Sequence, residues 1–145
     1  MYANDGFREL GRSECLRLLA RVPVGRIVHT RQALPAVLPV NFTLDDDAVV
    51  VRTSATSELV HAIDGSLVAF EADEFDSVAH SGWSVVVTGP ARVVEEQADL
   101  ERLLRTGPRS WVSWPQEVFV RIEPELVTGR ELVGGRTSYG LKLRS

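Results

Sequence analysis

The sequence predicts a mainly β fold, an antiparallel barrel with a few helices, and three observations lead to this prediction. Six β-rich runs follow one another at short spacing between residues 24 and 122. Helical patterns occur only near the start, in the middle and late in the chain, so strands and helices do not alternate as in a parallel sheet. The 145 residues contain no internal repeat or linker, which indicates one domain spanning residues 1–145.

Three segments carry helical signals. Residues 11–22 place apolar side chains at i, i+3, i+4 and i+7, which predicts an amphipathic first helix. Residues 57–63 predict a short second helix, with Thr56 or Ser57 as its N-cap. Residues 97–104 predict a third helix with leucines on one face.

The strand signals are short runs rich in β-branched residues. The predicted strands are 25–30, 36–44, 48–53, 66–71, 83–95 and 117–122. Asp45-Asp-Asp47 predicts the turn between the second and the third strand. Pro39 removes a ladder donor in mid-strand and Asn41 needs a hydrogen-bond partner, so we expect an edge or a bulge here. Such a strand either lines a cleft with its free backbone groups or is a plain kink in the barrel.

The composition excludes several functional classes. The 16 basic and 20 acidic residues give a net charge of -4 without any basic block, so we expect no nucleic-acid partner. No apolar run approaches the ~18 residues of a membrane helix, so we expect no membrane association. Cys15 is predicted to be a buried thiol, which fits a reducing, cytoplasmic location. The three histidines have no metal-ligand spacing, so no metal site is expected.

The end of the third predicted strand is a candidate phosphate site. Arg52 and Thr53 end that strand, Ser54 and Ser57 follow, and the start of a helix comes next. Arginine offers forked donors and a helix start offers backbone N–H groups, so this arrangement suits an anion. A purely structural alternative stays open, because Arg52 can pair with a carboxylate such as Glu71 while the hydroxyls cap the helix.

Other features are less specific. Trp83 lies beside Gly82 and before Ser84, which suits either stacking on a ring or filling a barrel end. Glu71 and Asp73 share a strand face but form no convincing catalytic pair. Dinucleotide-binding, P-loop and zinc-protease motifs are absent from the sequence, so the catalytic residues are unknown and any reactive group is expected to be a cofactor. Residues 136–145 are predicted to be a polar tail or a dimer arm.

Several motifs in order resemble one known family. They are Val24-Gly-Arg-Ile27, Leu38-Pro-Val-Asn-Phe42, Val51-Arg-Thr53, Val68-Ala-Phe-Glu-Ala-Asp73 and Ser81-Gly-Trp-Ser-Val-Val-Val-Thr-Gly-Pro-Ala-Arg-Val93. With them the chain resembles the pyridoxamine 5'-phosphate oxidase-like, FMN-binding split-barrel family, near its small actinobacterial, nitroimidazole-reductase-like members. The resemblance implies a split β-barrel of Greek-key type and a homodimer with two flavin mononucleotide (FMN) sites at the subunit interface.

The resemblance also implies a function. It implies an FMN-dependent oxidoreductase that reduces a small molecule by hydride or electron transfer. Two alternatives stay open, a deazaflavin-coenzyme-dependent reductase and a non-catalytic split-barrel dimer that binds a ligand or partner. Pyridoxamine phosphate oxidation itself is less expected, because the resemblance is to the shorter members.

Residue by residue, the resemblance implies a cofactor groove. It places Pro39, Val40 and Asn41 along the isoalloxazine, Arg52 and Thr53 on the phosphate, Ser54 and Ser57 beside it, and Trp83 and Ser84 near the ring. One position departs from the family pattern, because Glu58 stands where relatives commonly have a lysine. A carboxylate there is expected to weaken phosphate binding, unless it points to solvent or pairs with Arg52.

Overall fold

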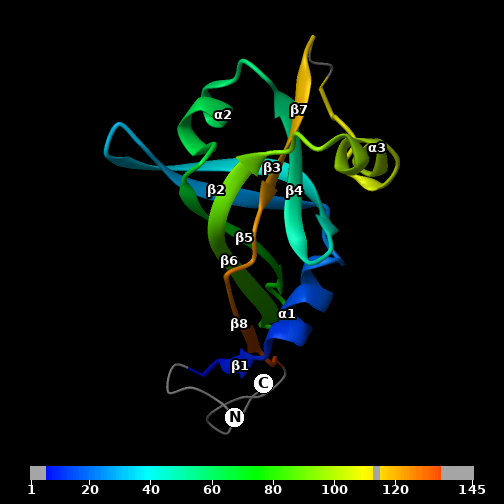
Figure 1. Ribbon diagram of the computed structural model, residues 1–145. Helices are drawn as coiled ribbons and strands as arrows, with labels where there is room; N and C mark the ends of the chain where they lie inside the picture. Colours follow the sequence, from blue (N-terminus) through cyan, green and yellow to red (C-terminus); the bar gives the residue numbers. More distant parts are fainter. Residues whose placement is uncertain (1–5, 113–114, 135–145) are drawn as a thin grey trace, which may run out of the picture.

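The computed structural model describes residues 6–112 and 115–134, which form a strongly twisted β structure with three helices on its outside (Figure 1). The elements in chain order are β1 (Arg8–Leu10), α1 (Arg12–Leu19), β2 (Val24–Arg31), β3 (Leu34–Asp45), β4 (Ala48–Ser54), α2 (Glu58–Ile63), β5 (Leu67–Asp76), β6 (Ser81–Val93), α3 (Gln97–Thr106), β7 (Glu117–Ile122) and β8 (Leu126–Leu132). No helix in these ranges is long and apolar enough to cross a membrane. The predicted tail at 136–145 lies outside them.

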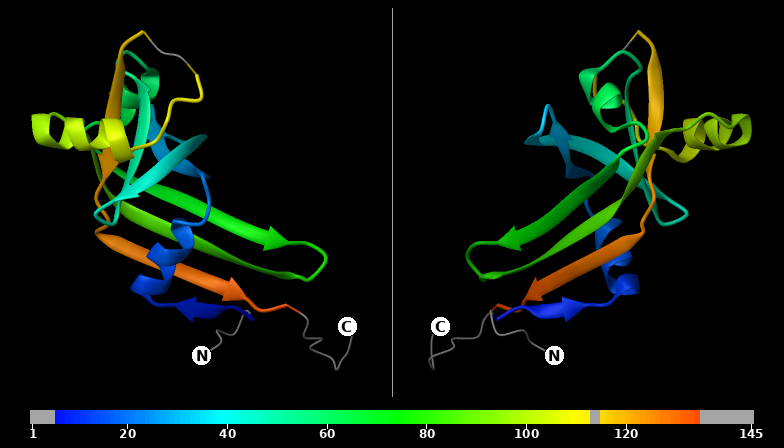
Figure 2. Two further views of the ribbon diagram at one scale, coloured as in Figure 1. Left: turned by 90° about the vertical axis from the view of Figure 1, so that its right-hand side faces the viewer. Right: turned by 60° about the vertical axis from the view of Figure 1, so that its left-hand side comes forward.

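Six of the strands close a barrel. Antiparallel pairings connect β6 to β5, β5 to β2, β2 to β3, β3 to β4 and β4 to β7, and β7 returns to β6. Strand β6 changes its neighbour on one side, because residues 82–88 pair with β8 and residues 91–93 pair with β7. The β5–β6 hairpin and β8 therefore run away from the barrel end that carries α2 and α3 (Figure 2). The predicted mainly β, antiparallel fold is confirmed.

Glycine is required where the barrel splits. A Cβ on Gly89 would collide with the carbonyl oxygen of Glu123, which belongs to the link between β7 and β8. That link crosses β6 where β6 changes partner. A side chain at this position would force the two segments apart.

Strand β3 has a free edge, as Pro39 predicts. Its residues 34–41 pair with β2, whereas only residues 42–45 pair with β4. The free segment thus has a hydrogen-bonded neighbour on one side only. Two-residue turns bound the strand at both ends: Gln32 and Ala33 precede it, and Asp46 and Asp47 follow it with the positive φ angles typical of tight hairpins.

The barrel interior is filled by aliphatic and aromatic side chains. Phe70 is fully buried and its ring lies 4.7 Å from that of Phe42, in an edge-to-face arrangement. On the outside, Leu103 of α3 packs with Val50 and Phe119. Helix α1 contributes Cys15, which is fully buried as predicted, and burial raises the pKa of its thiol.

The sequence prediction omits two strands. Strand β8 contains a glycine and three charged or polar residues, a composition that is unfavourable for strands. The structure explains the glycine, because a Cβ on Gly129 would meet the Cys15 sulfur 2.6 Å away. Strand β1 has only three residues and forms by pairing with β8. Strand β5 also runs beyond its predicted end at Glu71 to Asp76, since β6 pairs with it over its whole length.

Candidate functional site: a cavity at the free edge of β3

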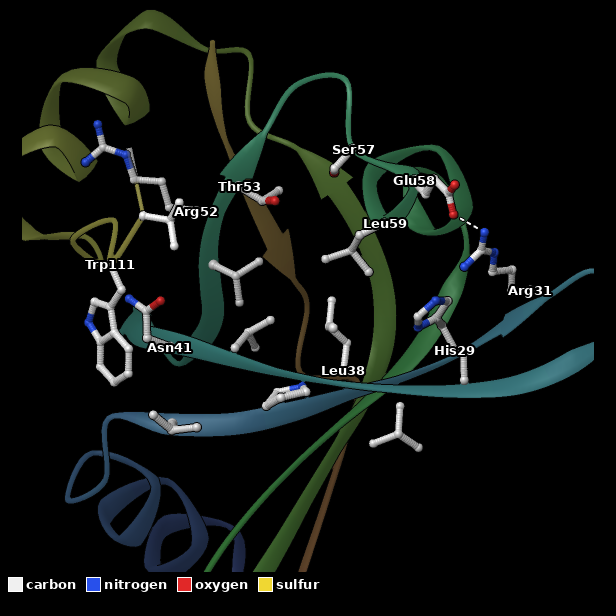
Figure 3. A pocket seen from close by; sticks show the side chains of 17 residues that line it. His29, Arg31, Leu38, Asn41, Arg52, Thr53, Ser57, Glu58, Leu59 and Trp111 are labelled. Carbon is white, nitrogen blue, oxygen red and sulfur yellow. Dashed lines mark ion pairs between the residues drawn. The ribbon is translucent and has the colours of Figure 1, made fainter. Parts of the chain in front are cut away.

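A cavity of about 680 Å³ opens at the free edge of β3 (Figure 3). Its walls come from the free segment of β3, the ends of β2 and β4, the start of α2 and the segment after α3. Its volume lies within the range usual for small-molecule sites. Seven of the ten predicted site residues line it: Pro39, Val40, Asn41, Arg52, Thr53, Ser57 and Glu58.

The cavity combines an apolar centre with polar sides. Leu38, Val51 and Leu59 form part of the apolar surface. In the view of Figure 3, Asn41 and Arg52 lie on one side, and His29, Arg31 and Glu58 lie on the other. Such a surface suits a flat, largely apolar molecule with polar groups at its ends.

Arg52 is held on the outer face of β4. Its Nη2 lies 3.0 Å from Glu117 Oε1, and its guanidinium carbon lies 5.0 Å from the centre of the Phe119 ring. Glu117 also accepts a hydrogen bond from Ser110. Arg52 thus pairs with a carboxylate, as the structural alternative expected, but the partner is Glu117 and not Glu71 or Glu58, because the antiparallel register of β4 and β7 places Glu117 and Phe119 beside it.

Arg52 and Thr53 point in different directions. They are consecutive residues of a strand, so their side chains leave opposite faces of the sheet. Figure 3 shows the Arg52 guanidinium directed away from the centre of the cavity. The Arg52 Nε is nevertheless buried without a hydrogen-bond partner. Contact of both residues with one phosphate remains a prediction.

The hydroxyl groups around α2 are mainly structural. Ser57 is the N-cap of α2, as predicted, and its Oγ accepts a hydrogen bond of 3.2 Å from the Val60 N–H. The Ser54 hydroxyl is buried 3.2 Å from that of Thr56 and does not line the cavity. Among the predicted phosphate hydroxyls, only those of Thr53 and Ser57 belong to cavity residues.

Asn41 has the hydrogen-bond partner that the sequence required. Its Nδ2 donates to the Arg109 carbonyl oxygen at 2.7 Å, which connects β3 to the segment after α3. This segment contributes Trp111 and Val112 to the cavity wall. The amide therefore positions the wall opposite α2.

Helix α3, which precedes that wall, is fixed by one carboxylate. Asp45 accepts hydrogen bonds of 3.0 and 2.8 Å from Arg102 on α3 and one of 2.6 Å from Arg121 on β7. The Arg102 hydrogen bonds, followed by that of Arg121, hold the pKa of the Asp45 carboxyl below its usual value. Asp45 therefore joins the β3–β4 turn, α3 and β7.

Two polar, titratable cavity residues, His29 and Arg31, are missing from the predicted site. They lie two residues apart on β2, and Arg31 forms an ion pair with Glu58. The His29 Nδ1 is buried without a hydrogen-bond partner, and burial, followed by the Arg31 charge, lowers the pKa of the imidazole. The sequence shows that His29 and Arg31 share one face of a strand, because they are two residues apart. Only the tertiary fold, however, brings the β2–β3 hairpin against α2.

Trp83 and Ser84 lie outside this cavity. Trp83 is buried at the far end of β6, where its Nε1 donates to Glu74 Oε1 at 3.3 Å. At the other end of β6, Ala91 forms a β-bridge with Asp64, the residue that follows α2. Ala91 is eight residues after Trp83, which corresponds to about 26 Å along a strand at ~3.3 Å per residue. Within one chain these two residues are therefore not brought together with the cavity residues.

Glu71 and Asp73 share a sheet face, as predicted, but do not line the cavity. Arg26 Nη1 lies 2.9 Å from Glu71 Oε1 and 3.3 Å from Asp73 Oδ2. Burial, with the neighbouring Asp73 as the next cause, raises the pKa of Glu71 to about 7. Within 6–112 and 115–134, no group of three or more His, Cys, Asp or Glu residues is arranged to hold a metal ion.

Comparison with known proteins identifies the family. An uncharacterized protein of Mycobacterium tuberculosis, Rv0080, is 45% identical over 133 residues, which cover 86% of this chain and 85% of the relative. The structure of an FAD binding protein from Mycobacterium smegmatis is 37% identical, with a TM-score of 0.76 over 86% of this chain and 98% of that one. A conserved protein of unknown function from Corynebacterium diphtheriae is 34% identical, with a TM-score of 0.75 over 89% of this chain and 100% of that one. The family model described as pyridoxamine 5'-phosphate oxidase matches residues 11–131, and the chain belongs to this family.

Proposed function

We propose that this protein binds a flavin nucleotide, FMN by preference, in the cavity at the β3 edge and uses it to reduce a small molecule. One observation supports this most directly. The cavity joins the free backbone edge of β3, an apolar centre and the polar side chains of Thr53, Ser57 and Arg31. A mostly apolar cavity with a few polar groups is the usual form of a small-molecule site, so it is suited to a largely apolar ligand with polar groups. The resemblance to an FAD binding protein supports a flavin as that ligand.

The residues present fit the parts of a flavin nucleotide. Pro39, Val40 and Asn41 would lie along the ring system, because the free edge of β3 offers backbone groups to a heterocycle. Thr53 and Ser57 would hold the phosphate with their hydroxyl groups. The apolar side chains in the centre would exclude water from the ring.

A bound flavin supplies hydride or electron transfer, and the protein residues bind and orient. His29 lies on the same side of the cavity as Arg31 and Glu58, and burial, followed by the Arg31 charge, lowers the pKa of its imidazole, which favours the neutral form at pH 7. A neutral imidazole holds one proton and offers one acceptor nitrogen, so it can hydrogen-bond either a carbonyl or an N–H group of a ligand.

We also propose that a second copy of the chain completes the site. Val37, Trp111 and Val112 line the cavity and are each more than half exposed. Apolar side chains gathered at one opening favour coverage by another surface. A partner subunit is also the means by which Trp83 and Ser84 would approach a ring bound in this cavity. Light scattering on the purified protein tests for the dimer.

The test of the cofactor is a titration of the dialysed protein with FMN, FAD and a deazaflavin coenzyme, followed by flavin fluorescence. We expect saturable FMN binding near one per chain. Thr53→Val should weaken FMN binding about tenfold, because one hydrogen bond to a charged phosphate is lost. Thr30→Val is the matched control, since Thr30 is an exposed strand residue that does not line the cavity.

The other outcomes separate the alternatives. Binding of the deazaflavin coenzyme without FMN would favour the deazaflavin-dependent reductase. A stable dimer that binds none of the three would favour a non-catalytic ligand-binding or partner-binding role. Equal FMN affinity of Thr53→Val and wild type would contradict the placement of the phosphate beside β4.

A further inference from the structure

We propose that Arg31 binds the phosphate of the flavin nucleotide and that Glu58 competes with this phosphate for Arg31. The inference rests on the proposed function, because it needs a phosphate-bearing ligand in the cavity. In this arrangement the ion pair between Arg31 and Glu58 is the ligand-free state of the site. The phosphate replaces the Glu58 carboxylate when the nucleotide binds.

The position of the ion pair supports this exchange. Both residues line the cavity, and their side chains point toward each other across its rim (Figure 3). Glu58 directly follows Ser57, whose hydroxyl belongs to the proposed phosphate contacts. An anion beside Ser57 is therefore next to the carboxylate that Arg31 already contacts.

The backbone holds Arg31 at this place. It is the last residue of β2 and pairs with Leu34 across the turn formed by Gln32 and Ala33. A two-residue turn leaves little freedom to the strand end. The guanidinium can then turn from one acceptor to another without movement of the hairpin.

The exchange needs little reorganisation. The side chain of Glu58 is 73% exposed and that of Arg31 is 54% exposed. Ion pairs between exposed side chains contribute little to stability, so a second anion can separate them. The guanidinium carries five N–H donors in a planar fork that matches phosphate oxygens, which gives the phosphate the advantage over one carboxylate.

Arg52, the other arginine of the cavity, is less available. Its side chain is 24% exposed, it is paired with Glu117, which is 19% exposed, and it stacks on Phe119. Breaking that pair would leave a carboxylate with little contact with water. Of the two arginines among the described cavity residues, Arg31 can therefore change its partner at lower cost.

A second feature on the same side of the cavity is independent of the ion pair. The His29 Nδ1 lies buried without a hydrogen-bond partner two residues before Arg31. Arg31 lies on the same strand as this imidazole, and burial, followed by the Arg31 charge, lowers the pKa of His29. A titratable cavity residue therefore lies next to the exchangeable cation, on the side of the cavity where the phosphate is proposed to bind.

The test is a double-mutant cycle with Arg31→Gln, Glu58→Gln and the double variant, titrated with FMN and with riboflavin. Riboflavin carries the same ring without the phosphate, so it separates phosphate contacts from all others. We expect Arg31→Gln to weaken FMN binding about tenfold and Glu58→Gln to strengthen it about fivefold. In the Arg31→Gln background, Glu58→Gln should give a clearly smaller gain, because it then relieves only the repulsion between Glu58 and the phosphate. Riboflavin affinity should change less than about twofold in every variant. Arg105→Gln is the control, since Arg105 is exposed on α3 and contacts the Glu101 carbonyl oxygen.

Four results would overturn the proposal. An equal gain from Glu58→Gln with and without Arg31 would mean that Glu58 only repels the phosphate. A parallel loss of riboflavin and FMN in Arg31→Gln would mean that Arg31 maintains the cavity and does not bind phosphate. If the wild-type protein binds neither flavin, the proposed function is refuted, and the inference with it. If riboflavin binds and the FMN affinity is unchanged in all variants, only the inference is refuted.

Discussion

Asp45→Asn is the substitution expected to loosen the cavity wall from a distance. Asp45 is 11% exposed and accepts three hydrogen bonds from Arg102 and Arg121. A hydrogen bond to a charged group contributes about 1.5 to 3 kcal/mol. Asparagine keeps one acceptor oxygen without the charge, so we expect a loss of about 2 to 3 kcal/mol in the free energy of unfolding. For a chain of this length that corresponds to about 6 to 10 °C in Tm.

The stabilisation by Asp45 is expected to change with pH in a definite direction. The two arginines lower the pKa of Asp45 in the folded state, so its stabilisation is present above the pKa of the unfolded chain, about 4. It is lost as the pH falls through the lowered pKa. The difference in Tm between wild type and Asp45→Asn should therefore be full at pH 7 and should shrink toward pH 3.

Thermal unfolding followed by circular dichroism measures this difference, and Asp47→Asn is the control. Asp47 is exposed in the same turn at φ 70°, which asparagine tolerates. If the free energy of unfolding of Asp45→Asn lies within about 0.5 kcal/mol of the wild-type value at pH 7, the reasoning is refuted. So small a loss is what a solvent-exposed ion pair would give. A Tm difference that persists unchanged at pH 3 would refute it as well.

Four further predictions follow from single contacts. Burial raises the pKa of Glu71 to about 7, above its value in the unfolded chain, so the folded state binds more protons between about pH 4.5 and 7 and stability falls as the pH rises through this window. Glu71→Gln should therefore raise the Tm at pH 8 and leave it nearly unchanged at pH 5, and equal Tm values at pH 8 would contradict this. Ser57→Ala should cost about 1 kcal/mol in urea unfolding because α2 loses its N-cap, and Ser57→Thr should retain most of the stability. Gly89→Ala should cost more than about 3 kcal/mol or prevent folding, because its Cβ meets the Glu123 carbonyl, whereas a Cβ on Gly11 would make only an ordinary contact of 3.8 Å with Glu14 Oε1, so Gly11→Ala is the comparison. Glu58→Lys should raise FMN affinity at least about tenfold by replacing a repulsion with an attraction, and an absence of any gain in the titration would count against a phosphate beside α2.

The strand and helix order follows from local sequence signals. Pro39 predicted an edge and the structure shows one, because a missing N–H is a property of the residue itself. The same holds for Ser57 as an N-cap and for the turn at Asp46 and Asp47. Strand β8 escaped prediction because its Gly129 is required by the packing of Cys15 more than a hundred residues earlier, and no local pattern shows that contact.

The candidate site was also predictable where its residues lie in local sequence motifs, but not where they meet only in the tertiary fold. Residues 39–41, 52 and 53 line the cavity, and they could be named from the sequence because each group belongs to a motif on one continuous strand, which the family resemblance identified. The ion pair of Arg31 and Glu58 joins a hairpin to a helix, and Arg52 pairs with Glu117 through the register of β4 and β7. Both partners could be assigned only after the tertiary structure placed them, since any of several carboxylates was compatible with the sequence.

The free edge of β3 limits what can occupy the cavity. In the closed barrel most strand segments are hydrogen-bonded to a neighbouring strand on both sides. Residues 34–41 of β3 have a neighbouring strand on one side only. Backbone groups on such an edge need a partner, and an added strand is the usual one. Pro35 and Pro39 remove two donors within this short segment, which disfavours a regular ladder with another chain. Trp111 and Val112 add apolar surface to the wall of the same cavity. An edge that resists strand addition yet lines a largely apolar cavity therefore favours a planar heterocycle over a peptide.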